Sequence, residues 1–443
     1  MSKAISRRNF LMATGAVGAA GLLAACGSKP AASSTASSAA SQAPAASADE
    51  SLALSDGPVS LSISWWGGDS RHAAYQSALE AFQAEHSNIT VEPTFAAWSG
   101  WEEKMAAAFI AGNAQDVCQV NWNWLYNYSA DGSKFVDLNT TSKFIDLTQW
   151  DSAAMDACYV ANSQQCVPVS MTGRIFYWNM TTFNKAGITE VPKSLDDLMA
   201  AGKAFQEKLG DDYYPMHLGA YDRMILMVFY LESKYGKDWA DPVTSTLNYT
   251  EEEIAEGLAF IKSLVDNHVM MNLKTYYSAN SDTATHQSNE WITGKIAGIF
   301  EWDSAASKYS SALDDSNKDG FTVGEEIKFG DNNGGFSKVS MGLAITKTCK
   351  NVAEAATLIN FLLNEEKGAS IMGSECGIPA SKAGLKFAQD AGAVKSLVAE
   401  ANAKVMAFTT NKLDPLFENN DLKASGTGIY QDCLLYTSDA ADE

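Results

Sequence analysis

The strongest constraint on the fold is a regular alternation of strand-like and helix-like segments that begins near residue 59. The first segment, "VSLSISWW", alternates apolar and polar residues, as a half-buried strand does. The next, "DSRHAAYQSALEAFQAEH", carries its large apolar residues at helical spacing. The pattern repeats, so the expected order is a strand at 59–66, a helix at 69–86, a strand at 89–95, a helix at 101–112 and a strand at 115–122. This order predicts a parallel sheet of the α/β class.

Three tryptophan-rich segments follow predicted strands. They are "WWGGDSRH" (65–72), "NWNWLYNY" (121–128) and "EWD" (301–303). Ligands of α/β sheets bind outside the carboxyl ends of strands, where such loops meet. Aromatic faces stack on the C–H faces of pyranose rings, while Asp, Asn, Arg and Glu side chains bind hydroxyl groups. The three segments together predict a carbohydrate site, although any single tryptophan can equally belong to the core.

A catalytic interpretation depends on Glu301 and Asp303. Glycoside hydrolysis needs two carboxylates that face each other about 5 to 10 Å apart, and nothing in the sequence marks these two as acid and base. The five histidines are scattered, and neither G-x-S-x-G nor H-E-x-x-H occurs. We therefore predict a binding protein and no enzyme, with a surface glycosidase using Glu301 and Asp303 as the alternative. A binding protein for a non-sugar solute, such as a polyamine or glycerol phosphate, is a third possibility.

The N-terminal segment 1–26 has the pattern of an export signal. A basic start, "MSKAISRRNF", precedes an apolar run that is too short to span a membrane comfortably. Within it, "SRRNFL" resembles the twin-arginine signature, which implies export of a folded chain. The following "LAAC" resembles a bacterial lipoprotein box, so we expect cleavage before Cys26 and lipidation of that residue.

Residues 27–57 are rich in Ser, Ala and Pro and nearly free of bulky apolar side chains, which predicts a flexible tether. A lipid anchor followed by a tether places the folded body on the extracellular face of the cytoplasmic membrane, with the anchor as its membrane contact.

The chain is strongly acidic. It has 32 Lys and Arg against 53 Asp and Glu, a net charge of −21, and the predicted signal peptide carries only basic charges. Such a surface repels phosphate backbones, which excludes nucleic acid as a partner and favours a neutral or cationic ligand.

A calcium-loop pattern, D-x-N-x-D-G-x5-E, occurs in "DSNKDGFTVGEE". Its side-chain ligands would be Asp315, Asn317, Asp319 and Glu326. Clusters of Asp, Asn and Gly are also ordinary turns, so the pattern gives calcium as a weak candidate and we predict no other cofactor. Six cysteines follow Cys26, and the possible pairs Cys158–Cys166 and Cys349–Cys376 stay open.

Longer stretches of the chain resemble family 1 of the extracellular solute-binding proteins, the sugar-capturing lipoproteins of bacterial ABC importers. The matching stretches are "WWGGDSRH…FQAEHSNITV", "WEEKMAAAFIAGNAQDVCQVNWNW", "VPVSMTGRIFYWNMTTFNKAGITEVPKSLDDL", "GKIAGIFEWD" and "KVSMGLAITK". The resemblance implies two α/β lobes joined by a hinge, with the sugar between them and an ABC permease and ATPase as partners of a monomer. It places lobe one at 58–168 plus 298–347 and lobe two at 170–296 plus 350–433.

The resemblance also implies a set of ligand-binding residues at the positions of the family's cleft loops. They are Trp66, Asp69, Arg71, Trp122, Trp124, Arg174, Tyr177, Trp302 and Asp303, to which the tryptophan pair adds Trp65. We expect the tryptophans to form a floor for sugar rings and Asp69 and Arg71 to bind hydroxyls, unless those two only form a local salt bridge.

The end of the chain departs from the family pattern. After "ASGTGIYQD" the family usually continues into a further helix, whereas "CLLYTSDAADE" resembles translated adapter sequence. We expect residues 434–443 to be non-native.

Overall fold

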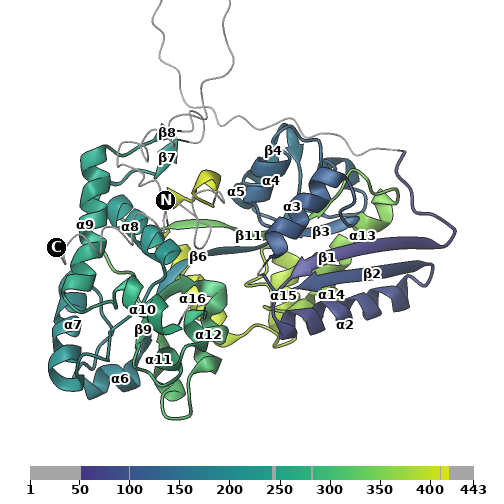
Figure 1. Ribbon diagram of the computed structural model, residues 1–443. Coiled ribbons are helices and arrows are strands. Elements are labelled where there is room, and N and C mark those ends of the chain that lie inside the picture. The colour runs from purple at the N-terminus through teal and green to yellow at the C-terminus, as the bar shows by residue number, and fades with distance from the viewer. Residues whose placement is uncertain (1–50, 99, 242–245, 281–282, 410, 419–443) are drawn as a thin grey trace, which may run out of the picture.

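The computed structural model describes residues 51–98, 100–241, 246–280, 283–409 and 411–418 (Figure 1). The predicted signal peptide, the lipidation site Cys26 and the tail at 434–443 lie outside these residues.

The first α/β units form as the sequence predicts. Strands β1 (Val59–Trp66), β2 (Ile89–Ala96) and β3 (Val117–Val120) are parallel, with β1 between the other two. Helices α2 (Asp69–Glu85) and α3 (Trp101–Ala111) provide the crossovers. One face of β1 points into the core, as the alternation requires, and all four apolar residues on that face are buried: Val59, Leu61, Ile63 and Trp65.

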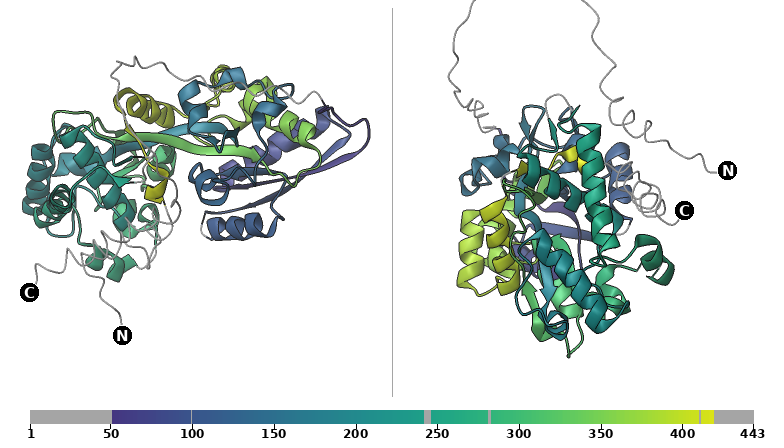
Figure 2. Two further views of the ribbon diagram at one scale, coloured as in Figure 1. Left: turned by 90° about the horizontal axis from the view of Figure 1, so that it is seen from above. Right: turned by 90° about the vertical axis from the view of Figure 1, so that its left-hand side faces the viewer.

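Two long strands continue this sheet across the molecule. Strand β11 (Phe336–Ile345) pairs antiparallel with β3 at its end and with β6 (Val167–Asn179) at its beginning. The second half of β6 then pairs with β9 (Gly298–Trp302) and β10 (Phe321–Val323). The chain therefore forms two lobes that share one mixed sheet, and the views in Figure 2 show this strand layer running from one lobe into the other.

Each lobe has its own set of helices (Figure 1). Lobe one holds α2 and α3 together with α4 (Asn123–Tyr128), α5 (Ser152–Asp156), α13 (Val352–Asn364), α14 (Glu366–Met372) and α15 (Lys382–Asp390). Lobe two holds α6 (Met180–Lys185), α7 (Leu195–Leu209), α8 (Ala220–Tyr235), α9 (Glu251–Asp266), α10 (Leu273–Asn280), α11 (Asn289–Ile292), α12 (Ala306–Ala312) and α16 (Ser396–Phe408). The short strands are β4 (Tyr159–Val160), β5 (Ser163–Gln164), β7 (Ala240–Asp241), β8 (Thr246–Leu247) and β12 (Asn411–Lys412).

The predicted lobe boundaries are wrong in two segments. The prediction assigned 298–347 to lobe one, but β9 and β10 lie in lobe two because they pair with the second half of β6. It assigned 350–433 to lobe two, but α13 to α15 pack on lobe one, where the Phe361 ring contacts that of Phe82 and Lys367 pairs with Glu85 at 2.9 Å.

The predicted tether also ends too late. The backbone N–H of Ser55 donates to Glu354 Oε1 at 2.6 Å, and the Asn88 amide donates to the carbonyls of Ser55 and Gly57, each at 3.2 Å. The last part of the 27–57 segment therefore belongs to the surface of lobe one.

Two further features concern the described part of the chain. Its five cysteines (118, 158, 166, 349 and 376) are buried free thiols, so neither of the two possible disulfides is present. In the same part, no helix has both the length and the apolar character needed to cross a bilayer.

Close packing of α7 provides a test of this fold. Gly202 is buried in α7, and a Cβ atom added there would overlap the carbonyl oxygen of Asn267. Alanine normally stabilises a helix interior relative to glycine, but we expect Gly202→Ala to lower the free energy of unfolding by about 1 to 3 kcal/mol because the backbone must move. Urea unfolding measures the change. Gly68→Ala is the control, since an added Cβ there meets nothing within 4 Å; equal effects of the two substitutions would contradict the packing.

Candidate functional site

The candidate site lies where β6 and β11 pass from one lobe to the other. Lys338 on β11 is the register partner of Thr172 on β6 at this point. Trp122, which follows β3, reaches the Lys338 ammonium group from lobe one, and Trp302, at the end of β9, reaches it from lobe two. The two indole centroids are 4.8 and 4.6 Å from Lys338 Nζ. The crossing thus brings together two predicted tryptophans from distant parts of the sequence, at about the same distance from one buried cation.

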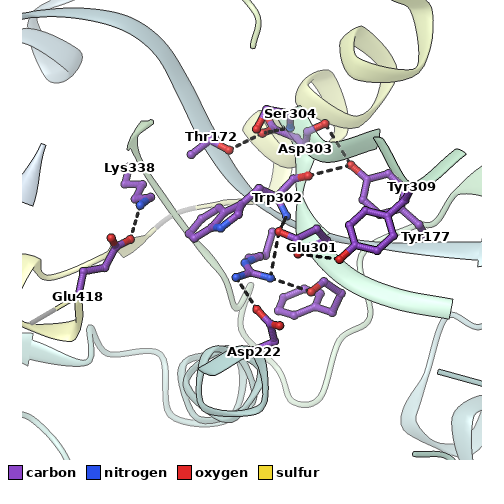
Figure 3. Close-up of polar contacts among 12 residues, drawn as sticks. Thr172, Tyr177, Asp222, Glu301, Trp302, Asp303, Ser304, Tyr309, Lys338 and Glu418 are labelled. Atoms are coloured by element: carbon purple, nitrogen blue, oxygen red, sulfur yellow. Dashed lines mark hydrogen bonds and ion pairs between the residues drawn. The ribbon is translucent and has the colours of Figure 1, made fainter. Parts of the chain in front are cut away.

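A C-terminal segment completes this arrangement. The 3₁₀ turn Pro415–Glu418 places the Glu418 carboxylate in an ion pair with Lys338, shown in Figure 3. The side-chain amide of Asn121 donates to Glu418 Oε2 at 3.0 Å, and that of Asn123 donates to the Glu418 carbonyl at 3.3 Å. Neither Lys338 nor Glu418 was among the residues predicted from the sequence. The available signal was Lys338 itself, the one charged residue of β11.

Arg174 is a structural centre of lobe two, and it lies close to this site. Its guanidinium group pairs with Asp222 at 2.7 Å and with Glu301 at 3.5 Å, and it donates to the Phe300 carbonyl at 2.8 Å. It also lies over the Trp302 ring, 4.3 Å from the centroid. Burial opposes the charged form of Arg174, but the two carboxylates raise its pKa above the usual value. Arg174 therefore fixes the position of Trp302, and its predicted role in binding the ligand directly stays untested.

Asp303 is buried beside the strand crossing. Its carboxylate accepts hydrogen bonds from Thr172 Oγ1 and from the backbone N–H of Ser304 at 2.7 Å (Figure 3). It also accepts one from Asn402 Nδ2 at 2.5 Å. Burial raises its pKa to about 6, although these hydrogen bonds act in the opposite direction. The Tyr177 hydroxyl donates toward the carbonyls of Trp302 and Asp303, at 3.2 and 3.1 Å. Tyr177 and Asp303, both predicted as ligand-binding residues, thus hold the turn after β9 in place.

Trp65 is a core residue, so its predicted role in ligand binding is wrong. The side chain is 0% exposed and stacks between the rings of Tyr75 and Phe95, with centroids 4.5 and 4.9 Å away. Its indole N–H donates to His72 Nδ1 at 3.0 Å. The alternation of β1 continues through this position and turns Trp65 toward the core.

Trp66 and Trp124 form an aromatic cluster with Trp98. The Trp66 centroid is 5.1 Å from that of Trp98 and 5.4 Å from that of Trp124. Trp124 is fully buried and donates to Glu102 Oε1 at 3.0 Å, so it supports the cluster and presents no face to a ligand. Trp98, which is 41% exposed, is the accessible ring and was not among the predicted site residues.

Arg71 and Asp69 have different surroundings. Arg71 Nε donates to the Glu375 carbonyl at 3.0 Å, and its Nη1 donates to the Trp66 carbonyl at 3.1 Å. A Cβ atom on Gly67 would lie 2.5 Å from Arg71 Cδ, so the glycine is what lets Arg71 fold back over the turn. Asp69 is exposed in the first turn of α2. Arg71 thus binds backbone carbonyls, and hydroxyl binding by either residue stays a prediction.

The predicted calcium loop makes contacts within the protein. Asp315 pairs with Lys318 at 2.6 Å. The buried Asn317 side chain donates to Asp314 Oδ1 and accepts from Asn179 Nδ2. Glu326 follows β10 and does not begin a helix. No group of three or more His, Cys, Asp or Glu side chains suited to a metal occurs among the described residues, and calcium binding stays a prediction.

Comparison with known proteins settles the family. The family of bacterial extracellular solute-binding proteins matches residues 68–369. The chain belongs to this family. Its two lobes joined by a shared sheet are accordingly those of a solute-binding protein.

Several solved structures resemble this solute-binding protein. One is a periplasmic oligogalacturonide-binding protein from Yersinia enterocolitica in complex with saturated digalacturonic acid. Its sequence is 34% identical, the match covers 87% of this chain and 94% of the Yersinia chain, and the TM-score is 0.79. A periplasmic solute-binding protein from Pectobacterium atrosepticum is 32% identical, with coverage of 86% and 98% and a TM-score of 0.79. Among curated relatives, a binding protein from Brucella abortus is 21% identical over 46% of this chain, and the match spans only 49% of that relative's length.

The buried carboxyl group of Asp303 gives a pH-dependent prediction. Because its pKa is raised to about 6 in the native state, Asp303 keeps a proton there that the unfolded chain loses near pH 4. The stability contributed by this carboxyl group therefore falls as the pH rises from about 4 to about 6. Asp303→Asn does not titrate. We expect its stability relative to the wild type to rise by about 2 kcal/mol between pH 4 and pH 7. Urea unfolding of both proteins at the two pH values measures this, and an equal difference at both would contradict the raised pKa.

Proposed function

We propose that this solute-binding protein captures a saccharide at the boundary between its lobes and delivers it to the permease and ATPase subunits of an ABC importer. The observation that carries the proposal is the convergence of Trp122 and Trp302, one from each lobe, on the strand crossing. Aromatic faces are the usual partners of sugar C–H faces. The Yersinia neighbour, at 34% identity over 94% of its length, binds an oligosaccharide, which supports the same class of ligand here.

The strand crossing also suits ligand-induced closure. In two-lobe proteins a few backbone positions between the lobes absorb the motion. Here Thr172 and Gly173 pair with Lys338 and Ser337, next to both tryptophans. A ligand that contacts both lobes favours the closed arrangement by its differential affinity for it. The lipid anchor on Cys26 and the 27–50 tether belong to this proposal, since they would hold the protein beside its permease.

The protein has no catalytic role in this proposal. Glu301 is bound by Arg174, and it accepts from the Trp302 backbone N–H at 2.9 Å and from the Tyr309 hydroxyl at 3.4 Å. Asp303 is only 1% exposed and occupied by three donors. Neither carboxylate is presented to a glycosidic bond, which argues against the glycosidase alternative. The carboxylates of Glu418, Asp222 and Glu301 are already paired with Lys338 or Arg174, which argues against a polyamine because they are not available to bind its ammonium groups.

Replacing each tryptophan tests the proposal. We expect Trp122→Leu and Trp302→Leu each to weaken saccharide binding about tenfold or more, because each substitution removes one aromatic face. Isothermal titration against mono- and oligosaccharides gives the affinity, and chromatography of the recovered sugar shows whether it is intact.

Trp291→Leu is the matched control for this experiment. Trp291 is a fully buried tryptophan of lobe two that packs on Tyr309, so the substitution is expected to cost stability while leaving the affinity of the folded protein unchanged. Equal losses of affinity in all three variants, or cleavage of the sugar, would contradict the proposal.

A further inference from the structure

The site at the strand crossing contains a buried ion pair. Lys338 and Glu418 form an ion pair at the strand crossing, with side chains that are only 8% and 3% exposed. A buried ion pair adds little net stability, because desolvation offsets most of the attraction, whereas a buried charge left without its partner is costly. Lys338 therefore requires an anion close to it, and one carboxylate can replace another with little net change in free energy.

The hydrogen bonds around Glu418 define which kind of anion fits. One carboxylate oxygen faces Lys338, and the other accepts from Asn121 Nδ2 at 3.0 Å. Asn123 Nδ2 lies beside them and donates to the Glu418 backbone carbonyl at 3.3 Å. A cation and an amide donor that bind the two oxygens of one group match a planar carboxylate.

Two unsatisfied oxygens show what Glu418 does not supply. Asn121 is 6% exposed and Asn123 is fully buried, yet the side-chain carbonyl oxygen of each has no hydrogen-bond partner within the described part of the chain. Buried polar atoms are nearly always paired in native structures. An ionised carboxylate has only acceptors, so Glu418 leaves these two acceptors without donors. A molecule that carries both a carboxylate and hydroxyl groups satisfies the lysine and both amides together.

The segment that carries Glu418 contacts both lobes. Glu418 binds Asn121 and Asn123 of lobe one, while the neighbouring Phe417 ring lies 6.0 Å from that of Tyr221 and 6.1 Å from that of Trp239, both in lobe two. The segment thus occupies the same boundary as the proposed saccharide site. Any ligand that brings a carboxylate to Lys338 must displace the Glu418 side chain.

We propose that Lys338, Asn121 and Asn123 form a carboxylate subsite for a uronic acid residue of the saccharide, and that Glu418 is an internal competitor for this subsite. This inference rests on the proposed saccharide function and deepens it. It replaces the expectation of a neutral or cationic ligand, which followed from the net charge of the chain and took no account of a buried local cation.

The test compares two disaccharides that differ in charge: digalacturonic acid and its neutral counterpart galactobiose. Isothermal titration of the purified full chain at low salt gives the ratio of the two affinities. We expect the wild type to prefer digalacturonic acid, and Lys338→Met to lower the affinity ratio about 10- to 100-fold, since a charge-assisted hydrogen bond is lost. Glu418→Gln is expected to raise the affinity for digalacturonic acid about tenfold, because the competing charge is removed.

Lys237→Met is the matched control. Lys237 also pairs with a glutamate, Glu253 at 2.9 Å, and also lies over two aromatic rings, those of Tyr235 and Tyr249, but it follows α8 in lobe two. We expect this substitution to leave the affinity ratio unchanged. If Lys338→Met fails to fold, as circular dichroism would show, Glu418→Gln still tests the competition.

The possible outcomes separate the two proposals. Equal affinities for the charged and neutral sugars in the wild type would overturn the carboxylate subsite and leave the saccharide function intact. Weaker binding of digalacturonic acid by Glu418→Gln would overturn the competition, because Glu418 would then be a ligand contact. Absence of binding by any saccharide in the panel would overturn the proposed function itself.

Discussion

The arrangement of the interlobe boundary depends on one buried guanidinium group. Arg174 connects β6 to the Phe300 carbonyl on β9 and to Asp222 on α8, and its flat face supports the Trp302 ring. Because a buried cation that loses its partners is costly, the two carboxylates and the carbonyl must all stay in place. Trp302 is thereby held in one orientation beside Lys338, and the turn after β9 is fixed further by Asp303 and its three donors.

Local patterns in the sequence predicted the local parts of this structure. The alternation in β1 and the helical spacing in α2 are properties of neighbouring residues, so the parallel β1–β2–β3 unit could be predicted. The same alternation places Trp65 on the core face with Leu61 and Ile63, so the pattern of β1 was a better guide to its orientation than the resemblance of the loop to a binding site. The stacking of Trp65 on Tyr75 of α2 agrees with this pattern.

Contacts between distant segments were beyond the reach of such patterns. The lobe boundaries failed because the two halves of β6 pair with strands that follow it much later in the chain. Lys338 and Glu418 are also distant in sequence, and although Lys338 is the one charged residue of β11, nothing in the sequence pairs it with Glu418. The same limit explains the expectation about ligand charge. A net charge of −21 is a sum over the whole chain, whereas the field at a buried site is set mainly by the few charges within it.

The antiparallel pairing of β3 with β11 also has a consequence for how the chain folds. These strands are joined in register from Val117 and Ile345 to Val120 and Gly342, and nearly all of lobe two lies between them in the sequence. During synthesis, β3 of lobe one therefore has no β11 to pair with until β11 has left the ribosome. Most of lobe two can form earlier, because it is built from contiguous chain. Such long-range pairing slows folding and prolongs exposure of unpaired strand edges, a hazard that is met in the cytoplasm if the chain is exported only after it has folded.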